Sequence, residues 1–222
     1  MSYSFEGEDR IAASLLRTIS AGRYLDIGCA EPLVISNTYL FYKLGWRGIG
    51  IDARPELTSE WARERPGDTF ISCLVDEEER EQLYWKFPDQ TMNTCDPETA
   101  LRYAERYPDK HTIEKRQTLS ARTIWNKVYG VNSGPPDFVT IDVEGHELPT
   151  IKGLISKEWK PALVLTEAKN FNLNRSLEHP LWKLLCKDLE YSLVAKTPLN
   201  AFFIDEKNPI FSWIPKSITD QS

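Results

Sequence analysis

Residues Tyr24–Asp52, YLDIGCAEPLVISNTYLFYKLGWRGIGID, predict a strand, a tight glycine turn, a helix and a second strand. The first apolar run ends at Gly28, as expected of a strand buried on both faces of a parallel sheet. Polar capping residues precede the apolar positions of the helix, which ends near Gly45. Ile49 and Ile51 then alternate with glycines up to Asp52. The stretch therefore predicts one βαβ half-unit with a carboxylate after its second strand.

Such a unit binds a nucleoside-containing cofactor beyond its strand ends, where Asp52 is placed to accept hydrogen bonds from a ribose. A dinucleotide fingerprint requires further glycines, but Ala30 and Leu33 follow Gly28 instead. Asp26, just before the turn, would repel a pyrophosphate and attract a cationic amine. S-adenosylmethionine carries an ammonium and a sulfonium, so the charge pattern favours it over NAD.

Four motifs resemble the FkbM-type methyltransferases: EGED near the start, LDIGCAEP, SNTYLFYKLGWRGIGIDARPE and FVTIDVEGHELPTIKGL. Together the motifs span most of the chain, and their order and spacing make the resemblance specific. The resemblance implies S-adenosylmethionine as cofactor, a Rossmann-like domain and a Gly-Glu-Asp segment near the cofactor, so that Glu8 or Asp9 would help to close the site. Cys29–Ala30–Glu31 departs from the family pattern, in which a second glycine is expected. The predicted cofactor-binding residues are Asp26, Gly28, Ala30, Glu31, Asn37, Thr38, Asp52 and Asp76.

The composition is that of an ordinary globular chain. Of 222 residues, 41% are hydrophobic and 27% charged, and no linker or repeat divides them, so we expect a single domain over 1–222. The net charge of -6 argues against nucleic acid and anionic membrane as partners. No apolar run is long enough to span a bilayer, and MSYSFEGEDR does not resemble a signal peptide, so a cytoplasmic protein is expected. The four cysteines are scattered and predict neither zinc nor disulfides.

After Asp52, segments with a clear secondary-structure pattern alternate with a segment that has none. A third strand is predicted over Thr69–Val75. In this architecture the loop after the third strand lies near the adenine, so Asp76 is a candidate partner of the adenine amine. The alternative is that Asp76 is a solvated loop carboxylate. The stretch 84–115 lacks periodicity and carries several aromatic residues and prolines. It is interpreted as an irregular, substrate-facing insert, because aromatic side chains offer stacking platforms. A helix is predicted over Thr118–Val128.

The densest group of ionisable residues follows the strand predicted at Phe138–Val143. Asp142, Glu144 and His146 are the predicted catalytic residues, because a carboxylate at the end of a buried strand is costly unless it has a function. A further strand at Ala162–Thr166 ends in Glu167. Asp142 and Glu167 would then stand at neighbouring strand ends and could share Mg²⁺. Alternatively, one of these side chains takes a hydroxyl proton directly, with His146 or Glu144 preferred.

The end of the chain predicts a helix at Leu177–Leu189 and strands at Tyr191–Lys196 and Ala201–Ile204. This antiparallel pair completes the predicted fold: α/β, a Rossmann-like doubly wound seven-stranded sheet of the class I methyltransferase type. The tail 208–222 is expected to pack on its own domain or to form a dimer contact.

These patterns together predict an S-adenosylmethionine-dependent O-methyltransferase. The resemblance implies an acceptor hydroxyl on a sugar, glycoconjugate or polyketide-like metabolite, and a homo-oligomer is left open. The alternatives are a dinucleotide-dependent oxidoreductase, for which Asp52 is also suited, and a non-catalytic cofactor-binding module.

Overall fold

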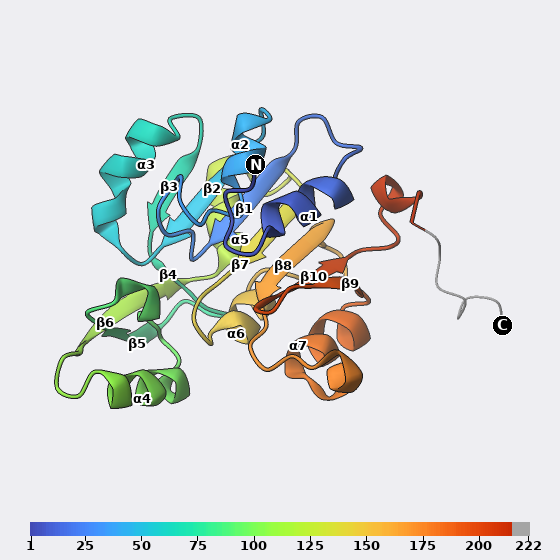
Figure 1. The fold of residues 1–222 in the computed structure, drawn as a ribbon. Coiled ribbons are helices and arrows are strands. Elements are labelled where there is room, and N and C mark those ends of the chain that lie inside the picture. The colour runs from blue at the N-terminus through green and yellow to red at the C-terminus, as the bar shows by residue number, and fades with distance from the viewer. Residues whose placement is uncertain (215–222) are drawn as a thin grey trace.

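A seven-stranded sheet forms the centre of the protein in the computed structural model, which describes residues 1–214 (Figure 1). The five strands β3, β2, β1, β7 and β8 are parallel, and β10 runs antiparallel between β8 and β9. The predicted class I methyltransferase sheet, with its terminal antiparallel pair, is thereby confirmed. In spatial order the strands are β3 (Thr69–Ser72), β2 (Arg47–Asp52), β1 (Arg23–Ile27), β7 (Phe138–Ile141), β8 (Leu163–Glu167), β10 (Asn200–Ile204) and β9 (Ser192–Lys196).

Strand order reverses between β1 and β7, and this reversal locates the ligand crevice. From β1 the chain moves outward through β2 to β3, and it later returns to place β7 on the other side of β1. Tyr24 pairs with Gly48 on one side and with Phe138 on the other. In open parallel sheets, ligands bind beyond the carboxyl ends of the strands at such a switch point.

Helices cover both faces of the sheet (Figure 1). One apolar cluster packs Ala12 and Phe41 against strand residues such as Phe138, and a second packs Trp125 and Ile151 against the opposite face. The helices of this domain are α1 (Glu8–Leu15), α2 (Tyr39–Lys43), α3 (Thr58–Glu64), α5 (Ala121–Tyr129), α6 (Glu147–Lys152) and α7 (Pro180–Trp182), with a π-helical turn at Lys183–Asp188 and 3₁₀ turns at Pro55–Leu57, Leu173–Glu178 and Pro209–Phe211.

The insert is regular, and the prediction of an irregular segment over 84–115 is wrong. It contains β5 (Glu81–Lys86), a 3₁₀ turn (Gln90–Met92), α4 (Pro97–Arg106) and β6 (Thr112–Leu119). With β4 (Leu74–Val75), these strands form a second, three-stranded sheet in the order β4-β6-β5. β5 and β6 are half-exposed and rich in charged residues, so their sequence lacks the apolar alternation that identifies a strand.

Three predicted boundaries differ from the structure by more than two residues. The strand expected at Thr69–Val75 breaks at Cys73, because its last two residues pair with β6 instead of β2. The helix expected from Thr118 begins at Ala121, where Ser120 caps it by accepting from the amide of Thr123 (3.1 Å). The helix expected at Leu177–Leu189 begins at Pro180, because a proline is favoured in a first turn and disfavoured inside a helix.

The described part of the tail packs on its own domain. Phe211 is buried in the core cluster of α1, and the Arg17 guanidinium lies 3.5 Å from the centre of the Trp213 ring. Residues 215–222 of the predicted docking tail lie outside the described residues. Across 1–214, no helix combines the length and the apolar character that crossing a membrane demands.

Candidate active site

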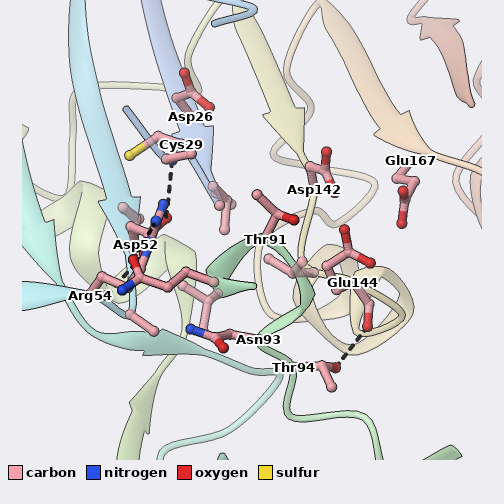
Figure 2. Close-up of a pocket in the computed structure, with 18 of the residues that line it drawn as sticks. Asp26, Cys29, Asp52, Arg54, Thr91, Asn93, Thr94, Asp142, Glu144 and Glu167 are labelled. Atoms are coloured by element: carbon pink, nitrogen blue, oxygen red, sulfur yellow. Dashed lines mark hydrogen bonds and ion pairs between the residues drawn. The ribbon is translucent and has the colours of Figure 1, made fainter. Parts of the chain in front are cut away.

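A cavity of about 410 Å³ opens at the carboxyl ends of β1, β2 and β7 (Figure 2). Asp52 and Arg54 lie on one side of it, and Asp142, Glu144 and Glu167 lie together on the other. The structure therefore brings to one cavity most of the residues that the sequence selects. Those on the lining are Asp26, Gly28, Ala30, Glu31, Asn37, Asp52, Asp142, Glu144 and Glu167; Thr38, Asp76 and His146 are not.

Gly28 joins the two sides of the cavity. Its φ of 77° lies in the left-handed region, which favours glycine. A Cβ atom at this position would overlap the carbonyl oxygen of Asp142. The amide of Gly28 donates to the carbonyl of Ile51 (2.8 Å), so the turn after β1 is fixed to β2 as well. Any larger residue would separate the loops that line the cavity.

The carboxylate of Asp52 is held by the backbone and by an arginine. It accepts from the amides of Ala30 (3.0 Å) and Arg54 (2.9 Å), and from the Arg54 guanidinium (3.0 Å). Arg54 also contacts Glu31 (3.3 Å) and Gln90 of the insert (3.2 Å). This arginine was not among the predicted site residues, although it stands two positions after Asp52. A ribose bound here would meet a carboxylate already fixed in orientation.

Asp26 is supported from behind by Thr38, whose hydroxyl donates to its carboxylate (2.5 Å). The fully buried Arg65 donates in turn to the Thr38 hydroxyl (3.1 Å). Burial raises the pKa of Asp26 to about 6, and the hydrogen bond from Thr38 and the charge of Arg65 limit that rise. Thr38 therefore positions Asp26 and does not itself line the cavity.

Asp142 follows β7 and faces the open cavity. The hydrogen bonds found within residues 1–214 include none to its carboxylate, in contrast to those of Glu144 and Glu167. The Asp142 side chain is exposed to the open cavity, and partial desolvation by the surrounding protein, followed by the negative charges of Glu167 and Glu144, raises the pKa of Asp142 well above its usual range. A carboxylate of this kind is a stronger base than one in free solution.

Glu144 connects the insert to the sheet. Its carboxylate accepts from the Tyr103 hydroxyl on α4 (2.5 Å) and from Lys169 (2.7 Å), and its carbonyl accepts from Thr94 (2.7 Å). Its φ of 52° is unusual for a residue with a side chain. The insert thus fixes the loop after β7 in a conformation that directs Glu144 toward the cavity.

Lys169 lies between two of the three carboxylates of this side. Its ammonium is 2.7 Å from Glu144 and 2.8 Å from Glu167. Their charges raise the pKa of Lys169 against the opposing effect of burial, so the lysine remains a cation. Oxygens of Asp142, Glu144 and Glu167 lie within 4.8 Å of one another, a grouping that could hold a metal ion. The ammonium already neutralises part of this group, and a divalent ion would have to displace it.

His146 and Asp76 form a separate buried pair. The His146 Nε2 atom lies 3.3 Å from Asp76 Oδ1, and the Asp76 carboxylate accepts from the Arg80 guanidinium (2.8 Å). Burial lowers the pKa of His146. This pair connects the end of β4 to the start of α6, and neither residue lies on the lining of the cavity.

The insert and the N-terminal segment complete the lining. The insert contributes Asn93 and Thr94 to the lining. Glu8 lines the opposite edge and accepts from the Asn200 amide (2.9 Å). Asp9 instead accepts from Ser2 (2.6 Å) and so orders the first residues of the chain. Further lining residues that sequence reasoning missed are Tyr84, Gln90, Thr91 and Cys95.

The sheet order and the cavity define an α/β protein that binds a nucleoside-containing cofactor at its switch point. The family model "Methyltransferase FkbM domain" matches residues 26–193. The chain therefore belongs to the FkbM methyltransferase family, as its motifs predict, and is an S-adenosylmethionine-dependent methyltransferase. This membership favours the predicted methyltransferase over the dinucleotide-dependent oxidoreductase.

Two solved structures resemble the fold at low sequence identity. A TehB-like SAM-dependent methyltransferase from Corynebacterium glutamicum is 11% identical with a TM-score of 0.44, over 90% of this chain and 88% of that one. The C-terminal domain of precorrin-6Y C5,15-methyltransferase from Rhodobacter capsulatus is also 11% identical with a TM-score of 0.41, over 88% and 85% of the two chains. No curated protein matches the chain.

Proposed function

We propose that this methyltransferase acts on a hydroxyl group, with Asp142 as the base that accepts the hydroxyl proton. The observation that carries this proposal is the Asp142 carboxylate after β7, which faces the cavity, accepts no hydrogen bond from residues 1–214 and has a raised pKa. The acceptor class retained from the family resemblance is a sugar, a glycoconjugate or a polyketide-like metabolite.

The lining fits S-adenosylmethionine. Asp26 offers a negative charge for its ammonium, Asp52 offers acceptors for its ribose, and Leu74 and Val75 offer an apolar surface for its adenine. When bound, the cofactor supplies a sulfonium methyl group, and its transfer to the acceptor oxygen leaves S-adenosylhomocysteine. A cationic sulfonium bound in this cavity would also favour the ionised form of Asp142 that a base requires.

Asp142 and Lys169 have different tasks in this proposal. Asp142 takes the hydroxyl proton as the oxygen attacks, and the loops joined at Gly28 hold it against the cofactor site. Lys169 cannot act as a base, because its raised pKa keeps it protonated. Its ammonium reduces the repulsion between Glu144 and Glu167, and stabilises negative charge that develops on the acceptor oxygen.

Mg²⁺ held by Asp142 and Glu167 is the second candidate for stabilising the negative charge on the acceptor oxygen, and the sequence analysis proposed this ion. The oxygen cluster has suitable ligand atoms, but Lys169 occupies the space between Glu144 and Glu167. We therefore favour a mechanism in which the ammonium takes the place of the divalent ion. Such an enzyme would keep its activity in a chelator.

Binding and turnover test the proposal separately. Calorimetric titration should show binding of S-adenosylmethionine and S-adenosylhomocysteine but not of NAD, and Asp52→Ala should weaken it. Release of S-adenosylhomocysteine is then measured with hydroxylated acceptors from the three classes. Cofactor binding without turnover on any of them would support the non-catalytic module, and NAD binding alone would refute the methyltransferase mechanism.

The same proposal includes the cellular location, the partners and the oligomeric state of the enzyme. The acidic net charge and the four free cysteines support a cytoplasmic protein without a nucleic-acid partner. A homo-oligomer remains part of the proposal, and measurement of the mass in solution tests it.

A further inference from the structure

A second cleft, of about 280 Å³, adjoins the cavity. The two share Glu144, Glu167 and Lys169 on their linings. A molecule lying in the second cleft can therefore reach Glu144 and Glu167, which lie beside Asp142. It does not have to pass through the part of the cavity that is lined by Asp52.

The cavity alone leaves little room for an acceptor. Its volume of about 410 Å³ lies at the lower end of the range that proteins use for a single small ligand. A cofactor in contact with both Asp26 and Asp52 would extend across β1 and β2 and fill that side. An acceptor larger than a few atoms consequently needs space elsewhere.

The insert builds one wall of the second cleft. Glu98 and Arg102 are exposed on α4, and the lining also includes His179, which caps α7, and Leu181 within α7. The floor includes Gly145, where a Cβ would overlap the Thr99 hydroxyl, so α4 packs directly on the loop after β7. In Figure 1, α4 and α7 lie on opposite sides of α6.

The ionisable side chains of the lining are predominantly acidic. There are five carboxyl groups against the two cations Arg102 and Lys169, although burial raises the pKa of Glu147 and raises that of Glu167 to about 7. His179 adds no positive charge near neutral pH, because burial lowers its pKa. Glu98 lies in the first turn of α4 and is exposed to solvent. The carboxylates of the lining are Asp96, Glu98, Glu144, Glu147 and Glu167.

From this lining we infer that the second cleft binds the body of the acceptor, and that the acceptor is a polyhydroxylated molecule that is neutral or carries an amine. The inference rests on the proposed O-methyltransferase function. Hydroxyl groups can donate to the carboxylates and accept from Arg102 and Lys169. An excess of negative charge discriminates against phosphorylated or carboxylated acceptors.

Glu98→Lys tests the charge of the cleft, and Glu105→Lys is the matched control. Both are exposed glutamates on α4, and Glu105 lines neither the cavity nor the cleft. The probes are methyl β-D-glucopyranoside, D-glucosamine and D-glucuronate, which are neutral, cationic and anionic. Saturation-transfer NMR measures their binding to the full chain in complex with S-adenosylhomocysteine, and calorimetry measures cofactor affinity.

The native protein should bind the neutral and cationic probes more tightly than the anionic one. Glu98→Lys should reduce this preference by about fivefold, since one charge is reversed at a solvent-exposed site, with cofactor affinity unchanged. Glu105→Lys should leave the preference as it is. Equal effects of both substitutions, tighter binding of glucuronate by the native protein, or no binding of the neutral and cationic probes would overturn the inference.

Methyl transfer is scored separately from binding. Probe binding that responds to Glu98→Lys, without release of S-adenosylhomocysteine when the methylated cofactor is supplied, would retain the cleft as a binding site and count against the proposed function. Binding of the cofactor, without any probe binding that responds to Glu98→Lys, would count against the inference alone.

Discussion

At the ends of β1 and β2, Asp26 and Asp52 are both held by hydrogen bonds from the protein, whereas at the end of β7 the Asp142 carboxylate has no such partner among the described residues. The first side resembles a binding surface whose geometry is fixed before a ligand arrives. On the second side, Glu144 and Glu167 share Lys169 while Asp142 is left available. The difference separates carboxylates that orient a ligand from one that can take part in proton transfer.

Asp142→Asn should have the largest effect, because it removes the free base and keeps the shape of the side chain. We expect methyl transfer to fall by about a thousandfold, within the usual range for loss of a general base. Affinity for S-adenosylmethionine, measured by calorimetry, should change little. Normal turnover in this variant would show that the two sides do not differ in the way proposed.

Lys169→Met should reduce turnover by about a hundredfold, because it removes one preorganised cation from the site. The variant should also gain affinity for Mn²⁺ in a calorimetric titration, since Glu144 and Glu167 then lose their ammonium partner beside Asp142. Lys152→Met, an exposed lysine away from both clefts, is the control. Inhibition of the native enzyme by EDTA, with recovery in Mg²⁺, would instead support the metal.

The affinity for S-adenosylmethionine should decrease as the pH is lowered, because Asp26 becomes protonated. The pKa of this carboxyl is raised to about 6, so it becomes protonated and neutral as the pH falls through that value. The attraction to the ammonium of the cofactor is lost, and affinity should decrease by up to about tenfold per pH unit below it.

Calorimetry between pH 5 and 8 measures this slope, and Asp26→Asn should bind weakly with no such slope. Because the folded-state pKa lies above the usual value, the buried charge of Asp26 costs stability at neutral pH, and thermal unfolding of the cofactor-free protein should show that cost decrease as the pH falls through about 6. An affinity that is independent of pH in the native protein would contradict the assignment.

Tyr103→Phe should have the smallest effect, since it removes one hydrogen bond between the insert and Glu144. Loss of a hydrogen bond to a charged group predicts a decrease of about tenfold or somewhat more in turnover, with cofactor affinity unchanged. Tyr107→Phe, on the same insert, is the control. An equal decrease in both variants would indicate general loosening of the insert instead of a specific contact with Glu144.

The strand ends were the part of the site that the sequence identified best. Buried apolar runs that contain Asp26 near their end, or that are followed by Asp52, Asp142 or Glu167, have a period and a boundary that can be recognised locally, and parallel packing brings those boundaries to one edge. His146 and Asp76 carry the same residue chemistry a few positions away. Their direction depends on the packing of α6 against β4, which no local pattern reveals.

Local patterns were enough to predict the α/β class, the seven-stranded sheet, the family and the carboxylates of the cavity, because apolar periodicity, glycine turns and motif spacing are properties of short segments. Three features are visible only in the folded domain: the strands and the helix within 84–115, the pairing of Arg54 and Lys169 with the carboxylates, and the second cleft beside the first. Each of these depends on pairs far apart in the chain, such as Glu81 with Gln117 and Tyr103 with Glu144. Their contacts are fixed by the packing of the whole domain and have no counterpart in local residue patterns.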